Sequence, residues 1–208
     1  MQEMLVLPGG GDPKKYSTWF ELDFTKYPLG TFSGFTDRGI TFNRTTGTSA
    51  TVLDEGLPAM DFVGDGALSG GTTPDRLLNN DWKITMNLKV KAGATNPMIF
   101  VGRSIQGNGS GTWIANMLNN GYLDWWYNAN RVNAGPAVTK GVYHEIIFES
   151  INKSLTVTVD GSPTINNKTI PDLADGTSFN LMIGGSQDQA LYHSRCLMRS
   201  IKIETKKR

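Results

Sequence analysis

Residues 121–128 place aromatic rings next to polar side chains at alternate positions. In a β-strand, successive side chains point to opposite faces, so this segment divides into two sets. The set that we expect in the core is Leu123, Trp125 and Tyr127. The set that we expect on the outer face is Tyr122, Asp124, Trp126 and Asn128. Rings beside a carboxylate and an amide are typical of a sugar site, because a ring stacks on a pyranose while the polar groups bond its hydroxyls.

We therefore expect Trp126 to contribute most to ligand binding. The alternative is that both faces of this strand are half buried and Trp126 packs beneath a loop. The glycine-rich residues 102–111 are a predicted loop, the kind of element that carries recognition on a rigid scaffold. Arg103 and Asn116 complete the candidate ligand-binding set, as side chains near this loop that we expect on the Trp126 face.

A second constellation is the pair of carboxylates Glu21 and Asp23, two positions apart in a predicted strand and so on one face. Two carboxyl groups about 5–5.5 Å apart are the arrangement of retaining glycoside hydrolysis, where one is the nucleophile and the other the acid. The alternative, which we favour, is two solvent-exposed carboxylates on an edge strand. Catalysis by this pair stays a remote alternative.

Two histidines and a single cysteine limit the catalytic and metal chemistry that this chain could do. His144 and His193 are too few for a metal cluster or a catalytic triad. Cys196 has apolar neighbours, as a small buried hydrophobe does. We expect no catalytic residue, no metal and no cofactor, and a structural role for His144.

The elements that must position these residues are short strands. Residues 84–91 alternate apolar and polar side chains without interruption, as a strand with one face on the core does. Residues 155–159 repeat the alternation and run into Asp160 and Gly161, which suit the positive φ angles of a tight hairpin. Further strands are predicted over residues 19–24, 39–43, 50–53, 59–63, 98–103, 113–118, 122–128, 143–149, 179–183 and 199–204, with one helical turn at 171–175. This pattern predicts an all-β sandwich or barrel.

Size and composition fit one such domain, because single all-β domains run to about 200–250 residues and this chain has 208. Its 20 basic residues balance 19 acidic ones, so we expect neither nucleic acid nor a membrane as partner. We find no signal peptide and no membrane span, and expect synthesis in the cytoplasm. Residues 1–15 are a predicted flexible arm, and residues 16–208 the domain.

Several segments occur in an order that resembles a known family. They are the strand over residues 82–90, an aromatic-His strand over 142–148, the strand and Asp-Gly turn over 155–161, and Leu-Met-Ile-Gly-Gly over 181–185. An earlier segment, 58–66, ends in Gly-Asp-Gly. Together they resemble the laminin G-like and pentraxin-like branch of the concanavalin A-like superfamily. The resemblance implies a jelly-roll sandwich of two antiparallel sheets, one concave and often used to bind glycans or proteins.

The chain departs from that superfamily in two respects. The closing segment around Arg199 lacks the glycine and paired acids expected there, so we do not expect the usual calcium site. Laminarinase-like glycosidases of the superfamily carry a further acid where this chain has Thr25, and on a central rather than an opening strand. This departure supports the non-catalytic interpretation of Glu21 and Asp23.

We therefore predict a non-catalytic recognition module, with a glycan as ligand, displayed on a larger assembly. The alternative is a virion structural protein, such as a phage capsid decoration or tail component, that uses the sandwich for docking or host attachment. Residues 1–15 would then mediate homo-oligomer or virion assembly. These alternatives leave the localisation open between a virion and a cell-surface assembly.

Overall fold

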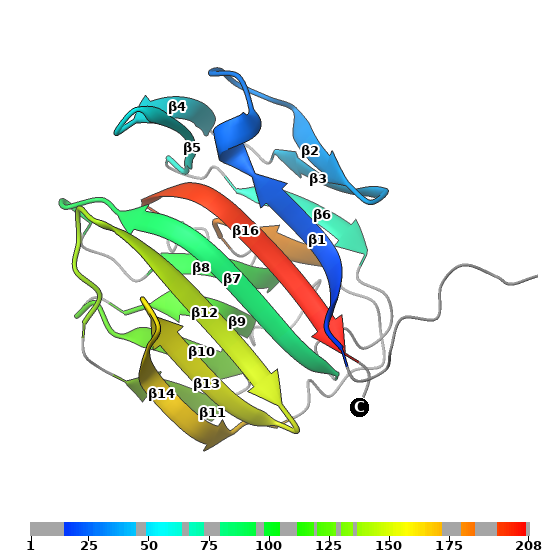
Figure 1. Cartoon of the computed structure of the whole chain (residues 1–208), viewed down its shortest axis with the longest axis vertical. Coiled ribbons are helices and arrows are strands. Elements are labelled where there is room, and N and C mark those ends of the chain that lie inside the picture. The colour runs from blue at the N-terminus through cyan, green and yellow to red at the C-terminus, as the bar shows by residue number, and fades with distance from the viewer. Residues whose placement is uncertain are drawn as a thin grey trace, which may run out of the picture.

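The computed structural model describes residues 15–44, 49–63, 67–72, 80–94, 98–104, 112–118, 120–127, 130–134, 137–171, 180–185 and 195–206. These residues form two antiparallel β-sheets that lie face to face (Figure 1). The predicted all-β sandwich is therefore confirmed. No described helix has the length and hydropathy that a membrane span requires. Except for Lys15, the predicted arm lies outside the described residues.

The first sheet is the one nearer the viewer in Figure 1. Its order is β14 (Ser162–Thr169), β13 (Ser154–Val159), β12 (Tyr143–Ile151), β7 (Asp81–Val90), β16 (Cys196–Lys206), β5 (Leu57–Asp61) and β4 (Ala50–Asp54). Strand β1 (Ser17–Asp23) also pairs with β16, from Ser17↔Thr205 to Asp23↔Ser200. Strand β16 thus joins the first strand of the chain to the centre of the sheet.

The second sheet lies behind the first in Figure 1 and carries residues 123–127 of the aromatic segment. Its order is β11 (Asn130–Ala134), β10 (Leu123–Tyr127), β9 (Thr112–Met117), β8 (Met98–Ser104), β15 (Asn180–Ile183), β6 (Leu68–Thr72), β3 (Ile40–Arg44) and β2 (Gly34–Asp37). Each described pairing in this sheet is antiparallel. The segment of interest is therefore the second strand from one edge.

The core lies between the two sheets and follows the predicted alternation. In β7, Ile84, Met86 and Leu88 are fully buried, as are Leu155 and Val157 of β13. The turn after β13 has the predicted left-handed backbone, with φ of 50° at Asp160 and 78° at Gly161. One-sided burial of alternating side chains is thus what holds these strands in register.

The strand expected over residues 19–24 ends one residue early. Phe24 begins a 3₁₀ turn, η1 (Phe24–Lys26), for which Asp23 is the N-cap residue. A carboxylate at this position accepts hydrogen bonds from the first turn, which favours leaving the strand there. Phe24 itself is buried and meets Phe35 edge-on at 5.2 Å between ring centroids.

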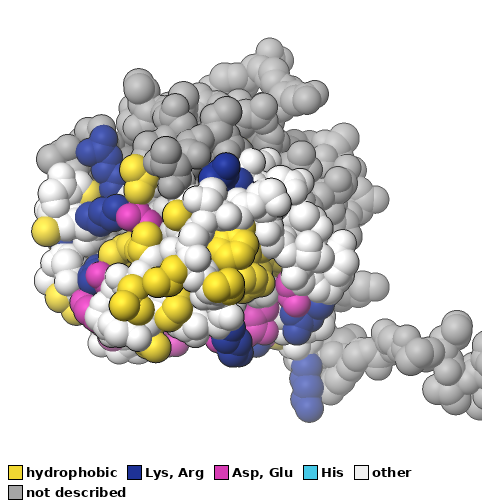
Figure 2. All heavy atoms as spheres, turned by 90° about the horizontal axis from the view of Figure 1, so that it is seen from above, with side chains coloured by type: hydrophobic (Ala, Val, Ile, Leu, Met, Phe, Trp, Pro, Cys, Tyr) yellow, Lys and Arg dark blue, Asp and Glu magenta, His cyan; other side chains and the backbone are white. Residues whose placement is uncertain are grey.

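One end of the sandwich exposes apolar side chains. Leu29 is 54% exposed, Leu53 61% and Leu57 46%. Leu29 lies beside β4, because Gly30 and Thr51 form an isolated antiparallel bridge. Figure 2 looks onto the molecule from above and shows hydrophobic side chains next to acidic and basic ones. Apolar and charged side chains therefore share the surface at this end.

Candidate functional site

The register of the second sheet shows which residues share the outer face with Trp126. Leu123 and Trp125 are 0% and 2% exposed and belong to the core, as predicted. Asp124 and Trp126 alternate with them and therefore point away from the core. Trp126 has two Cα partners, which are Trp113 on β9 and Arg131 on β11. Arg131 thus lies directly across from the ring that sequence analysis singled out.

Asp124 is completely buried on this face and has two partners. Arg131 Nε donates to both carboxylate oxygens at 3.1 Å, and its Nη2 lies 3.0 Å from Oδ2. Asn116 Nδ2 donates to the same Oδ2 at 3.0 Å. Burial raises the pKa of Asp124, while the bonds from Arg131 and Asn116 act in the opposite direction. The carboxylate is thus held in one place by neighbours on both adjacent strands.

Asn116 brings a further polar atom to this cluster. Its side chain is 1% exposed, and its buried Oδ1 accepts no hydrogen bond from the described part of the chain. A buried acceptor that lacks a donor costs about 1–3 kcal/mol. The Oδ1 of Asn116 can therefore accept a hydrogen bond from one more donor, such as a hydroxyl group or a water molecule.

The sequence candidates separate into different environments. Asp124 and Asn116, both predicted as ligand-binding residues, are buried and bonded to each other. Trp126 is half-buried and Tyr122 is 39% exposed. Across the sheet, Trp126 pairs with Trp113, and Trp113 pairs with Gly102. Arg103 is the residue after Gly102 and pairs with Leu181, so it is not in register with Trp126. Asn128 lies outside the described residues.

Sequence analysis missed Arg131, which is 43% exposed and is the most accessible charged group of this cluster. No strand is predicted over residues 130–134 in the sequence analysis, whereas the structure places β11 there. The signal that was present is their distance from the predicted strand over 122–128. Two residues separate Tyr127 from its Cα partner Asn130, which is the length of a tight hairpin connection.

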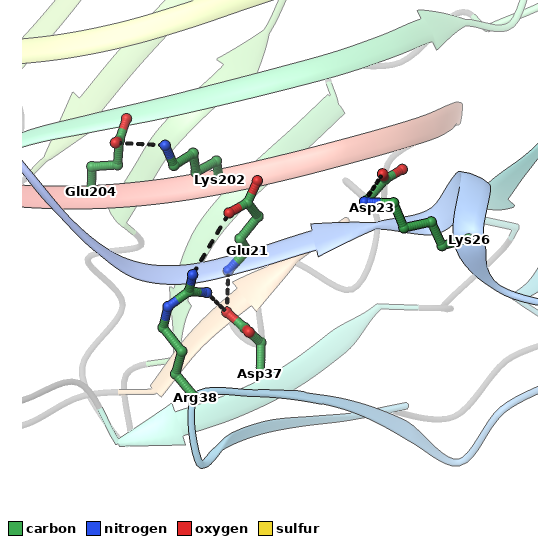
Figure 3. Close-up of polar contacts among 7 residues, drawn as sticks. All are labelled: Glu21, Asp23, Lys26, Asp37, Arg38, Lys202 and Glu204. Carbon is green, nitrogen blue, oxygen red and sulfur yellow. Dashed lines mark hydrogen bonds and ion pairs between the residues drawn. The ribbon is translucent and has the colours of Figure 1, made fainter.

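A second candidate surface is a polar pocket of about 350 Å³ at the end of β1. Its lining residues are Glu21, Asp23, Lys26, Tyr27, Asp37 and Arg38. Figure 3 shows Glu21 and Asp23 extending from β1, each with its own basic partner. Arg38 Nη2 lies 3.9 Å from Glu21 Oε2, and Lys26 Nζ lies 3.0 Å from Asp23 Oδ2. The two carboxylates are therefore separately paired.

Asp23 serves the backbone of this region. Its Oδ1 accepts from Thr25 N at 3.2 Å and from Thr25 Oγ1 at 2.5 Å. Burial alone would raise the pKa of Asp23, but the bonds from Thr25 and Lys26 outweigh it and lower the pKa. The acid of a glycosidase needs a raised pKa. Asp23 is shifted in the opposite direction.

The neighbouring Asp37 protects the edge of β1. Its Oδ2 accepts a 2.8 Å hydrogen bond from Glu21 N and also contacts Arg38 Nη1 (Figure 3). A side chain that covers a strand's outer N–H groups prevents pairing with another chain. Each acid of this pocket thus has a basic partner within the fold.

His144 and Cys196 also have structural surroundings, whereas His193 lies outside the described residues. His144 Nδ1 lies 2.7 Å from Asp160 Oδ2, and its Nε2 lies 3.1 Å from Thr139 O, which ties the β13–β14 turn to β12. Cys196 is buried in the core, as predicted. Among the described residues, no group of three or more His, Cys, Asp or Glu side chains could hold a metal ion.

The comparison with protein families agrees with this architecture. The model of a family described as "Concanavalin A-like lectin/glucanases superfamily" matches residues 65–203. The chain belongs to this superfamily. The matched region of this concanavalin A-like domain begins just before β6 and ends within β16, so it includes strands of both sheets. No curated protein matches the sequence.

Solved structures share the fold of this concanavalin A-like domain at low sequence identity. Trypanosoma rangeli sialidase in complex with the inhibitor DANA has 15% identity and a TM-score of 0.64, with 86% of this chain and 30% of the sialidase chain covered. Domain 4 of AbnA, a GH43 extracellular arabinanase from Geobacillus stearothermophilus, in complex with arabinotriose, has 16% identity and a TM-score of 0.59, with 81% and 82% covered. The binding domain of botulinum neurotoxin DC in complex with SialylT has 9% identity and a TM-score of 0.54, with 85% and 48% covered. These likenesses show the fold alone.

Proposed function

We propose that this concanavalin A-like domain is a non-catalytic glycan-binding module, and that it binds the glycan on the outer face of the second sheet. The observation that carries the proposal is the pairing of Trp126 with Arg131 across β10 and β11. An aromatic side chain next to a fixed hydrogen-bond donor offers a sugar both ring stacking and a polar contact. Asp124 and Asn116 act beneath them as positioning residues.

The arabinanase domain supports a glycan ligand. It is matched over 82% of its own length and is described in complex with arabinotriose. The sialidase is matched over only 30% of its chain, so its inhibitor complex bears less on this domain. The arabinanase domain, with the same fold and most of its length covered, is therefore the more informative structural neighbour.

The surroundings of the two acids favour a module without catalysis. Asp23 is committed to capping η1, with its pKa lowered by Thr25 and Lys26 against the opposing effect of burial. Glu21 faces Arg38, and its backbone is held by Asp37. A retaining mechanism needs one acid with a raised pKa beside one ionised nucleophile. We propose that the pair has no such role.

The experiment that tests this proposal is glycan binding by Trp126→Ala. We expect the variant to bind at least about tenfold more weakly than the unchanged chain, because a central aromatic contact contributes more than 1.4 kcal/mol. The measurement is a glycan array that includes arabinotriose and sialyllactose, followed by isothermal titration of the glycans that bind. Trp126→Phe, which keeps a ring, should retain most of the affinity.

The matched control is Leu53→Ala, which removes an exposed apolar side chain from the other sheet. It should bind as the unchanged chain does. A thermal melt of each variant checks that the domain is folded. If the unchanged chain binds no glycan on the array, or if folded Trp126→Ala binds normally, the proposed function or its site is wrong.

A further inference from the structure

The described side chains bond the guanidinium of Arg131 along one edge and leave its other edge open. The side edge, formed by Nε and Nη2, is directed at Asp124, with distances of 3.0–3.1 Å. Among the described residues, only Asp124 bonds this guanidinium, so Nη1 and the outer N–H of Nη2 have no partner there. These N–H groups form the planar fork that matches a carboxylate in a two-bond contact.

Arg38 shows how an arginine with an occupied fork differs. Its Nη1 contacts Asp37 and its Nη2 lies 3.9 Å from Glu21, so both terminal nitrogens already face acids. Its exposure of 46% is close to the 43% of Arg131. The two arginines are therefore similarly accessible, but the terminal nitrogens of Arg38 already face acids, whereas the described residues leave the fork of Arg131 open.

Arg131 is also held before any ligand arrives. Asp124 is fully buried, and Asn116 on the opposite neighbouring strand fixes the same carboxylate. A donor that is already oriented loses less side-chain entropy on binding than a mobile surface arginine does. This arrangement places the open fork next to Trp126 on the sheet face.

We infer that the glycan bound on this face is acidic, and that the open fork of Arg131 binds the carboxylate of a sialic or uronic acid residue. This inference rests on the proposed function. Because Asp124 compensates the charge of Arg131, the preference for the acid arises from hydrogen-bond geometry rather than from a long-range field. The sugar ring lies towards Trp126, which orients the carboxylate towards β11.

Isothermal titration of the whole chain with matched glycans tests this inference. The carboxylate probes are 3′-sialyllactose and trigalacturonate, and the neutral probes are lactose and arabinotriose. The probe that binds is then measured again after its carboxylate has been reduced to a primary alcohol. We expect the acid to bind at least about tenfold more tightly than its reduced form, the difference typical of a charge-assisted pair.

Variants assign the effect to Arg131. Arg131→Gln alone would leave Asp124 buried without its counter-charge, so the test uses the double variant Asp124→Asn with Arg131→Gln, and Arg131→Lys. The double variant should lose the preference for the acid, and Arg131→Lys should retain part of it, because lysine keeps the charge but not the fork. Arg38→Gln is the matched control and should bind like the unchanged chain.

The outcomes separate this inference from the proposed function. Binding of neutral and acidic probes with equal affinity, or acid binding that survives loss of Arg131, overturns the inference and leaves a glycan-binding module. Binding of no glycan at all overturns the proposed function as well. Acid-selective binding that depends on Arg131 and is unchanged in Arg38→Gln supports both.

Discussion

Gly70→Ala is expected to lower the free energy of unfolding by about 3 kcal/mol, the upper part of the range for overpacked sites. A Cβ atom on Gly70 would lie 2.1 Å from Thr41 O and 2.4 Å from Phe42 Cα. Both are backbone atoms of β3, which pairs with β6 at Phe42↔Gly70. Phe42 is fully buried and packs on Phe20 at 4.4 Å between ring centroids, so β3 cannot move away without disturbing the core.

Urea unfolding followed by tryptophan fluorescence measures this effect. The matched control is Gly93→Ala, because a Cβ atom there would have no atom within 4 Å. The control should change the free energy of unfolding by about 0.5 kcal/mol or less. Equal stability of Gly70→Ala and the unchanged chain would contradict the close approach of β6 and β3.

Lys89→Met is expected to lower the free energy of unfolding by about 2 kcal/mol at pH 7, as loss of charge-assisted hydrogen bonds at a buried site does. Lys89 is 8% exposed; its Nζ contacts Asp54, lies 2.8 Å from Glu55 Oε1 and is 4.8 Å from the ring centroid of Tyr143. Asp54 and Glu55 end β4 and enter the turn to β5. Methionine fills similar space but cannot bind the turn.

The pH dependence of this effect has a definite sign. Burial alone would raise the pKa of Asp54, but hydrogen bonds from Lys89 and Tyr143 outweigh it and lower the pKa. An acid whose folded-state pKa is lowered stabilises the fold above its unfolded pKa of about 3.9, and this stabilisation is lost as the pH falls through the folded value. The difference between Lys89→Met and the unchanged chain should therefore be full at pH 7 and shrink below about pH 4.

Urea unfolding at a series of pH values between about 3 and 7 measures this difference directly. The control is Lys83→Met on the same face of β7. Glu149 and Glu204 are the Cα partners of Lys83 on the neighbouring strands, but no ion pair within 4.0 Å joins it to the described residues. Its effect should be small at each pH. A difference for Lys89→Met that stays constant down to pH 3 would show that the Asp54 contact does not stabilise the fold.

The sequence predicted the strands whose burial is one-sided and missed those whose burial is not. Strand β7 buries every second side chain along its middle, and that period is visible in the residues. In β14, Ile165 is the one buried side chain, and β6 reads Leu-Ser-Gly-Gly-Thr. Such strands are defined by their hydrogen-bonded neighbours, which local periodicity does not reveal.

The candidate site was predictable to a similar degree. The alternation over 121–128 correctly assigned Leu123 and Trp125 to the core. It did not indicate that Asp124 is buried, because that depends on Arg131 and Asn116 from the two strands beside it. Likewise, the alternation over residues 19–24 gave no sign that Asp23 caps η1, since capping depends on where the strand ends rather than on its period.

The position of β16 at the end of the described chain determines when the first sheet can fold during translation. This strand pairs with β1, β5 and β7. Ser17 Oγ donates to Thr205 O, which lies 188 positions later in the sequence. During synthesis, those three partners leave the ribosome long before residues 196–206 do, and each then lacks the neighbour that satisfies one of its edges. The first sheet is therefore expected to close only after translation of β16, and ribosome-bound chains that stop before residue 196 should be more sensitive to protease than the released protein.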